Sequence, residues 1–229
     1  MNIMKILRTA LRPQFWSAMR MGVVPTLEHQ AAFDGLTFGT VIDVGANKGQ
    51  FSLFSRYLWP QAKIIAFEPQ PDQAKIFRGL NIQNADLLDL ALGSETSKTQ
   101  LHIASRKDSS SLLPLGEEQK EIFSMDEVGT IEVDVKRLDQ VLTSADLAAP
   151  TLMKIDVQGF EYEVLEGATE LLPYIDYIYL ELSVVELYVG QKLYDEVTKL
   201  LSANGFSETN ENSLKIKKDV QFDALFVRK

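Results

Sequence analysis

Apolar and polar residues follow one another along this chain in blocks that predict strands and helices in regular alternation. Continuous apolar runs, typical of strands buried on both faces of a parallel sheet, occupy residues 40–46, 63–69, 85–92, 152–157, 177–183 and 224–228. Segments with apolar residues at helical spacing lie between them, at residues 50–58, 71–80, 162–172 and 193–204. This alternation predicts an α/β fold, a doubly wound sheet that binds its ligands at the carboxyl ends of the strands.

The pattern changes between Thr99 and Leu142. The strings TQLHIA and TIEVDVK alternate apolar and polar residues with a period of two, and a polar stretch, SRKDSSSLLPLGEEQ, lies between them. A period of two predicts half-buried strands, so we expect an inserted hairpin that covers the sheet. No repeat or linker divides the remainder. We therefore predict one domain over residues 40–229, preceded by a helical extension over residues 1–39.

The N-terminal segment differs from the rest of the chain in charge. The chain has a net charge of -9, yet its first 27 residues contain no acidic residue and four basic ones, Lys5, Arg8, Arg12 and Arg20. Apolar residues recur there at helical spacing, and Pro13 is placed to break the helix. We favour a helix that docks on the sheet or on a partner subunit. A transit peptide and peripheral membrane contact through this basic helix stay open.

Composition removes several classes of function. The negative net charge argues against general binding of nucleic acid, which needs clustered Lys and Arg. The absence of cysteine excludes disulfides, thiolate zinc sites and cysteine nucleophiles. His29 and His102 lack zinc-site spacing, and the carboxylates show no local metal motif, so the metal stays unassigned. No apolar run approaches a bilayer span and no secretory signal is evident, so we expect a cytoplasmic protein.

A nucleoside cofactor site is predicted by the string TVIDVGANKGQF. A buried strand carries Asp43 to a turn in which Gly45 and Gly49 allow close backbone approach and Asn47 tolerates a left-handed conformation. Glu68 closes the next strand, 19 residues after Gly49. A carboxylate at that place can accept hydrogen bonds from both hydroxyls of a ribose.

The turn favours S-adenosylmethionine over a dinucleotide. Its string GANKGQ lacks the second and third glycines of the dinucleotide fingerprint. An acid two positions before the first glycine suits the ammonium group of S-adenosylmethionine instead. The residues expected to contact this cofactor are Asp43, Gly45, Ala46, Asn47, Gly49, Phe51, Glu68, Pro69 and Asp156.

Three carboxylates are candidates for proton transfer. The strand in LMKIDVQGFEYEVLEGA carries Asp156 to the same sheet edge, Gly159 permits a tight turn, and Glu161 begins the following helix. Glu181 closes the string YIYLEL. A carboxylate can act as the base for a hydroxyl when burial raises its pKa. Capping roles for Asp156 and Glu161 stay open, since acids also suit the first turn of a helix.

The acceptor is expected to bind through short polar side chains in the insertion and after the strand at residues 177–183. The candidates are Ser109, Ser110, Ser111, Glu186 and Tyr188, accompanied by Asp108 and Gln191. Such groups suit a small-molecule or glycan hydroxyl acceptor held for direct in-line transfer with water excluded. A solvated loop is the other interpretation of this polar stretch.

The combination of VIDVGANKGQF, IIAFEPQP, MKIDVQGFEYEVLEGA and the closing DALFVRK resembles the FkbM family of S-adenosylmethionine-dependent methyltransferases, over residues 40–229. The resemblance implies a class I methyltransferase fold, a Rossmann-like sheet of seven strands with the last one antiparallel, and O-methylation of a sugar or secondary metabolite. It implies a cofactor loop, a ribose acid and an I-D-x-x-G-x-E motif, formed here by Asp43, Gly45, Asn47 and Gly49, by Glu68, and by Asp156 and Glu161.

Two other functions stay open. Tyr188 and Lys192 form the Y-x-x-x-K of short-chain dehydrogenases, although Gly190 weakens the helix that this motif needs. An NAD(P)-dependent oxidoreductase would bind a dinucleotide, and a non-catalytic scaffold would bind neither cofactor. The sequence leaves homo-oligomerisation undecided.

Overall fold

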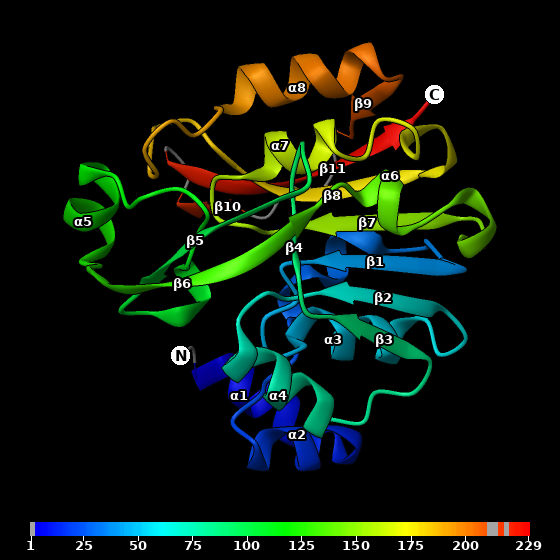
Figure 1. Cartoon of the computed structure of the whole chain (residues 1–229). Helices are drawn as coiled ribbons and strands as arrows, with labels where there is room; N and C mark the ends of the chain where they lie inside the picture. The colour runs from blue at the N-terminus through cyan, green and yellow to red at the C-terminus, as the bar shows by residue number, and fades with distance from the viewer. Residues whose placement is uncertain (1–2, 210–214, 218–219) are drawn as a thin grey trace.

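The structure is a computed structural model that describes residues 3–209, 215–217 and 220–229. Its main sheet contains eight described strands in the order β10-β11-β8-β7-β1-β2-β3, with β9 paired to β11 (Figure 1). Their bounds are β1 (Thr40–Val44), β2 (Lys63–Phe67), β3 (Ala85–Leu88), β7 (Thr151–Ile155), β8 (Tyr177–Ser183), β9 (Phe206–Glu208), β10 (Lys215–Lys217) and β11 (Gln221–Arg228). β1, β2, β3, β7 and β8 pair in parallel, and β11 runs antiparallel to β8. The predicted class I methyltransferase fold, with its last strand antiparallel, is confirmed, and β9 is one strand more than the seven expected.

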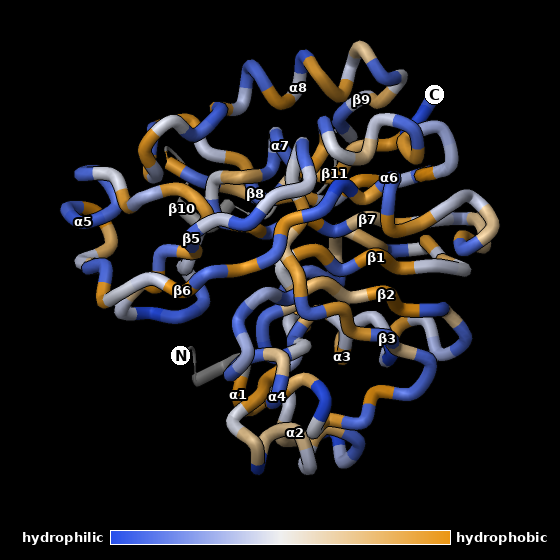
Figure 2. The backbone as a smooth tube through the Cα atoms, viewed as in Figure 1, coloured by the Kyte–Doolittle hydropathy of each residue, from blue (hydrophilic) through white to orange (hydrophobic). Residues whose placement is uncertain are grey.

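Helices cover both faces of this sheet. Their bounds are α3 (Gln50–Leu58), α4 (Pro71–Gly79), α6 (Leu138–Val141), α7 (Glu161–Glu166), α8 (Tyr194–Ala203) and the 3₁₀ turns η4 (Ser144–Asp146) and η5 (Leu172–Tyr174). Successive residues of a strand face opposite sides: Ile42 belongs to the core beneath α7 and α8, whereas Val41 belongs to the core beneath α3. Apolar residues accordingly follow the central strands in Figure 2.

The predicted helix over residues 162–172 is shorter than expected. α7 ends at Glu166, and Gly167 then lies against the neighbouring backbone, where a Cβ would be 1.9 Å from the Gly93 carbonyl oxygen. The chain then turns and forms η5, with Pro173 near its start.

The insertion forms a second sheet beside the carboxyl ends of the main strands (Figure 1). It contains β4 (Ala91–Leu92), β5 (Ser97–Ala104) and β6 (Glu127–Lys136) in the order β4-β6-β5, and its connection carries η3 (Lys107–Ser109) and α5 (Glu117–Phe123). β5 and β6 are antiparallel, so the predicted hairpin is present. The single strand predicted over residues 85–92 is wrong, because the chain leaves the main sheet after β3 and Ala91 pairs with Val135 of β6.

The N-terminal extension packs on the main sheet through aromatic residues. It comprises α1 (Ile3–Ala10), η1 (Pro13–Phe15), α2 (Trp16–Arg20) and η2 (Leu27–Phe33), so the helix breaks before Pro13 as predicted. The Phe33 ring lies 5.4 Å from Trp59 and 4.9 Å from Tyr179, centroid to centroid. The side chains of Ile3, Lys5 and Arg8 lie outside what the structure describes. Within the described residues, no helix is long and apolar enough to cross a bilayer.

Candidate active site

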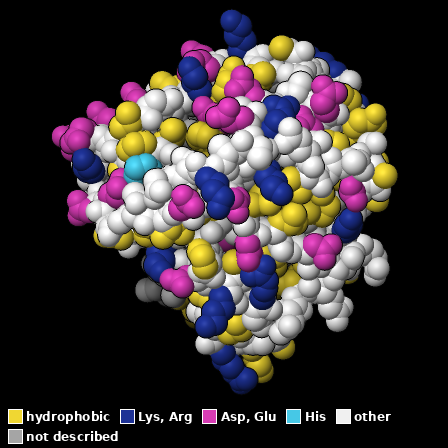
Figure 3. Space-filling view, viewed as in Figure 1, with side chains coloured by type: hydrophobic (Ala, Val, Ile, Leu, Met, Phe, Trp, Pro, Cys, Tyr) yellow, Lys and Arg dark blue, Asp and Glu magenta, His cyan; other side chains and the backbone are white. Residues whose placement is uncertain are grey.

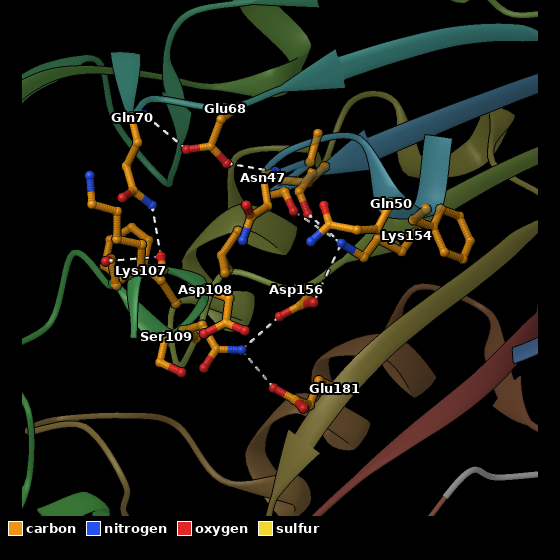
Figure 4. A pocket seen from close by; sticks show the side chains of 18 of the residues that line it. Asn47, Gln50, Glu68, Gln70, Lys107, Asp108, Ser109, Lys154, Asp156 and Glu181 are labelled. Carbon is orange, nitrogen blue, oxygen red and sulfur yellow. Dashed lines mark hydrogen bonds and ion pairs between the residues drawn. The ribbon is translucent and has the colours of Figure 1, made fainter. Parts of the chain in front are cut away.

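A cavity of about 740 Å³ opens at the carboxyl ends of the main strands (Figure 4). The loops after β1, β2 and β7 form its floor together with the end of β8 and the start of β11. The second sheet, the loop around η3 and the first turn of η2 form its walls. Parallel strands end at a common sheet edge, so motifs far apart in sequence meet here.

The turn after β1 is shaped by contacts inside the protein. Gly45 has φ +74°, and a Cβ there would lie 1.9 Å from the Asp156 carbonyl oxygen. Asn47 also has a left-handed conformation, with φ 50°. Gly45, Ala46 and Asn47 line the cavity, whereas Gly49 packs towards Phe77 on α4 and is not among its lining residues.

Glu68 lies at the end of β2 and joins two loops. One carboxylate oxygen accepts a hydrogen bond from the Asn47 amide at 2.7 Å and the other accepts one from the Gln70 amide at 2.8 Å (Figure 4). The residue is 3% exposed, and burial raises the pKa of its carboxyl to about 7. Pro69 lines the cavity beside it.

A buried lysine joins the motifs after β1 and β7. Asp43 and Lys154 are partners in the register of these strands, and Lys154 Nζ lies 3.4 Å from Asp43 Oδ1 and 3.6 Å from Asp156 Oδ2. Ser52 Oγ donates to Asp43 at 2.6 Å. Burial alone would lower the pKa of Lys154, but Asp156 and Asp43 raise it above its ordinary value. Asp43 is fully buried and not among the lining residues, whereas Lys154 lines the cavity.

Asp156 and Glu181 are bridged by one amide. Gln158 Nε2 donates to Asp156 Oδ1 at 2.7 Å and to Glu181 Oε2 at 2.9 Å, and Gln158 has the uncommon φ of 58°. Both carboxylates line the cavity (Figure 4). Burial raises the pKa of Glu181 well above its ordinary value, and the negative charges of Asp156 and Asp223 add to this effect.

Asp223 is a cavity residue that the sequence reasoning missed. The antiparallel register of β8 and β11 places it opposite Glu181. Burial, followed by the charge of Asp156, raises its pKa to about 8. The sequence signal for Asp223 is an acidic residue at the start of the apolar string ALFV. The signal for Lys154 is a basic residue within the largely apolar string LMKI.

Glu161 lies behind the cavity wall rather than on it. Its carboxylate accepts hydrogen bonds from the Val157 amide at 3.2 Å and from the Gly159 amide at 3.1 Å. It is not among the lining residues, and burial raises its pKa to about 7. Glu161, a candidate base from the sequence, thus lies outside the cavity lining, and its carboxylate fixes the turn that carries Gln158.

The N-terminal extension reaches the cavity. Residues 26–29 line it, and His29 Nδ1 lies 2.9 Å from the Tyr179 hydroxyl and 3.7 Å from Asp223 Oδ2. Phe51 lines the same side, and Lys154 Nζ lies 5.7 Å from the centre of its ring. No sequence pattern connects His29 with this site, because only tertiary packing brings η2 there.

The expected acceptor residues divide into two groups. Ser109 and Ser110 line the cavity together with Asp108. Ser111, Glu186 and Tyr188 are not among the lining residues; Ser111 Oγ accepts from the Leu113 amide at 3.0 Å and Glu186 Oε1 accepts from the Gly190 amide at 2.6 Å.

Tyr188 lies fully buried behind the wall. Its hydroxyl lies 2.9 Å from both the Ser109 carbonyl and Gln158 Oε1, and burial raises its pKa. Lys192 instead pairs with Glu196 at 3.0 Å. The Y-x-x-x-K string therefore does not form a dehydrogenase pair. Among the described residues, no cluster of three or more His, Asp or Glu side chains could hold a metal ion.

We expect the free energy of unfolding to fall as pH rises from about 5 to 8. Glu68 and Glu161 have folded-state pKa values of about 7 against an ordinary value of 4.5, so the folded chain holds protons that the unfolded chain has released. The stability that such a group contributes is fully present below its ordinary pKa of 4.5, and it is lost as pH rises through the folded-state pKa of about 7. The Glu161 shift corresponds to about 3 kcal/mol.

Urea denaturation at intervals across this range measures the effect. Glu161→Gln should flatten the pH dependence, whereas the surface change Asp89→Asn should leave it unaltered. Stability that rises between pH 5 and 8 would contradict the raised pKa values.

Comparison with known proteins relates the chain to methyltransferases. A family model described as the methyltransferase FkbM domain matches residues 43–208. Methyltransferase 1 of Beauveria bassiana is 30% identical over 183 residues, which cover 73% of this chain and 72% of that protein. 2-O-methyltransferase NoeI of Sinorhizobium fredii is 32% identical over 165 residues, 66% of each chain. The solved structure of magnesium protoporphyrin IX methyltransferase from Synechocystis PCC 6803 with bound SAM has a TM-score of 0.44 at 12% identity, over 100% of this chain and 85% of that chain, and is too distant to bear on function.

Proposed function

The chain belongs to the FkbM family of S-adenosylmethionine-dependent methyltransferases, and from this membership we propose that it O-methylates a hydroxyl of a sugar or another small, polyhydroxylated acceptor in the cavity at the strand ends. The observation that carries the proposal is the meeting of the turn after β1, Glu68 and Asp156 around one cavity of about 740 Å³. A similar relative, NoeI, is a 2-O-methyltransferase by name.

The hydrogen-bonding character of the cavity supports the cofactor. The ribose, ammonium and adenine amine of S-adenosylmethionine are hydrogen-bond donors, so its site should be rich in acceptors. Glu68 has lone pairs beyond those used by Asn47 and Gln70. Asn47 Oδ1 and Gln50 Oε1 are buried and have no hydrogen-bond partner among the described residues, and both residues line the cavity (Figure 4). A buried acceptor without a partner costs about 1–3 kcal/mol, which a bound donor would recover.

The charge of the cavity supports the same cofactor. Carboxylates outnumber cations in its lining: the carboxylates belong to Glu28, Glu68, Asp108, Asp156, Glu181 and Asp223, and the cations are Arg106, Lys107 and Lys154. When bound, S-adenosylmethionine supplies an electrophilic methyl group on a positively charged sulfur. Acidic walls favour such a cation over the neutral thioether product. Glu68 is the group that would hold the ribose hydroxyls, and the turn at residues 45–47 would hold the methionine end.

Proton removal from the acceptor is assigned to Glu181. Its carboxylate lines the cavity, and burial raises its pKa, which makes the ionised carboxylate a stronger base. Gln158 holds this carboxylate and that of Asp156 in place, because its Nε2 donates to Glu181 at 2.9 Å and to Asp156 at 2.7 Å. The buried Tyr188 hydroxyl lies 2.9 Å from Gln158 Oε1 and orients this amide, so Tyr188 is a positioning residue.

The loop at residues 106–110 would cover the acceptor. Gln70 Nε2 donates to the Lys107 carbonyl at 3.1 Å, and Lys107 Nζ pairs with Asp72 at 2.7 Å. These contacts hold Asp108 and Ser109 over the cavity (Figure 4). A cover of short polar groups excludes water while pairing with hydroxyls.

The proposal is tested by incubating the protein with methyl-labelled S-adenosylmethionine and a panel of mono- and oligosaccharides. Alkali-stable label on a sugar, located by mass spectrometry at an oxygen, is the expected result. Label confined to amines or carboxylates would contradict O-methylation.

Glu181→Gln should lower kcat about 100-fold, because the amide cannot accept the acceptor's proton. Cofactor affinity should change little, since Glu68 and the turn after β1 remain. Single-turnover kinetics with an acceptor found in the panel, together with a separate cofactor titration, distinguishes the two effects. Glu166→Gln, a carboxylate outside the cavity lining, serves as the control. A wild-type kcat in Glu181→Gln would transfer the role of base to Asp156.

A further inference from the structure

Exposed apolar side chains gather on the N-terminal extension. Half of the exposed large hydrophobic residues among the described residues lie within its first 21 positions, namely Leu7, Leu11, Trp16 and Met21. Leu11 is 81% exposed and Trp16 is 53% exposed. The Trp16 indole nitrogen donates to the Ala10 carbonyl at 2.8 Å, so this ring is held in place at the surface. We call these four residues and the elements α1, η1 and α2 the N-terminal face.

The segment that forms this face is basic in sequence, whereas the whole chain is acidic. Residues 1–27 contain four basic residues and no acidic one, and the whole chain has a net charge of -9. Arg20 is exposed, and the Arg12 guanidinium lies 5.7 Å from the centre of the Tyr57 ring. Figure 3 shows Lys and Arg next to hydrophobic side chains at the lower end of the molecule, where α1, α2 and α4 lie in Figure 1.

We propose that the N-terminal face docks on an anionic lipid surface. Short helical segments that combine basic residues with exposed Leu and Trp bind at the boundary between headgroups and acyl chains. The basic residues gain from the negative potential of anionic lipids, and the exposed apolar residues leave water. The acidic remainder of the chain would be repelled by the same surface, so the N-terminal face sets the orientation of docking.

A second copy of this chain fits the face less well. A two-fold interface brings the same patch of both subunits together. Two such patches would place basic residues against basic residues, with no carboxylate in either segment to compensate. Anionic lipid satisfies both the charge and the apolar character of the face.

Docking also bears on the cavity. The extension continues from α2 into η2, and residues 26–29 line the cavity. Lipid bound at the N-terminal face would therefore contact α2, the helix that precedes the part of the cavity wall formed by residues 26–29.

Flotation of the full chain with vesicles tests the proposal without cofactor or acceptor, so it can fail independently of the methyltransferase assignment. We expect the protein to float with vesicles of phosphatidylcholine and phosphatidylglycerol. With vesicles of phosphatidylcholine alone, it should remain in the dense bottom fraction. Raising the salt to about 1 M, where the Debye length falls to about 3 Å, should release it. The emission of Trp16 should shift to shorter wavelength on binding, whereas Trp59, which is buried, should not respond.

Variants on the N-terminal face distinguish specific docking from nonspecific adsorption to vesicles. Trp16→Glu should lower vesicle partitioning at least tenfold, and Arg20→Gln about fivefold. Matched changes elsewhere, Val128→Glu at an apolar position that is 65% exposed and Lys199→Gln on α8, should leave partitioning unchanged. Equal flotation with neutral vesicles, no flotation, or equal loss in the matched variants would overturn the proposal. A Trp16→Glu variant that dissociates a dimer without altering flotation would replace the lipid with a second copy.

Discussion

Gly45→Ala should abolish cofactor binding and destabilise the protein by about 4 kcal/mol, because the new methyl group has no room and the backbone conformation is strained. A Cβ at this position would lie 1.9 Å from the Asp156 carbonyl oxygen, and its φ of +74° disfavours any side chain. The clash between the new Cβ and the Asp156 carbonyl is relieved only if the turn after β1 moves away from the loop after β7. That movement would separate Asn47 from Asp156, the two walls between which the cofactor is proposed to bind.

Gly35→Ala is the matched control for this substitution. Gly35 has a similar φ of +76°, but a Cβ there meets nothing within 4 Å. It should cost about 1 kcal/mol through backbone strain alone and leave cofactor affinity intact. Urea denaturation and cofactor titration of both variants measure the difference. Equal losses in the two variants would show that close packing against Asp156 is not the cause.

Glu68→Ala should weaken binding of S-adenosylmethionine by about 100-fold or more. Hydrogen bonds to a charged group contribute about 1.5–3 kcal/mol each, and this carboxylate is proposed to accept two from the ribose. The substitution also frees the Asn47 and Gln70 amides that Glu68 now holds. Because the pKa of Glu68 is raised to about 7 by burial, wild-type affinity should fall as pH drops below 7, and this pH dependence should be weaker in Glu68→Gln.

Asp89→Ala provides the comparison for Glu68→Ala. Asp89 follows β3 and pairs with Arg78 at the surface, at 2.6 Å, outside the cavity lining. Its loss should leave affinity within about twofold, because an exposed ion pair contributes little. Unchanged affinity in Glu68→Ala would remove Glu68 from the cofactor site.

Motifs at strand ends were predictable from the sequence for a physical reason. In a parallel sheet, a continuous apolar run followed by a glycine or an acid places that residue at the carboxyl edge, whatever lies between the runs. Asn47, Glu68 and Asp156 meet at one cavity in this way. The antiparallel last strand came from the resemblance to the family, because a single apolar run does not reveal its direction.

Other parts of the site depend on side-chain direction and tertiary packing. Lys154 and Asp223 lie within apolar strands, and only the register with β1 and β8 shows that they face the carboxylates. Glu161 and Tyr188 carry suitable functional groups, yet both serve the turn around Gln158. His29 arrives through the packing of Phe33 into an aromatic cluster, which no local pattern encodes.

Calorimetric titration of the purified chain with S-adenosylmethionine, S-adenosylhomocysteine and NADPH, side by side, tests the central claim most directly. An acceptor-rich, acidic cavity without a pyrophosphate cradle should bind both adenosyl ligands with micromolar affinity and should not bind the dinucleotide. Binding of NADPH alone, or of none of the three, would contradict the assignment of this cavity to S-adenosylmethionine.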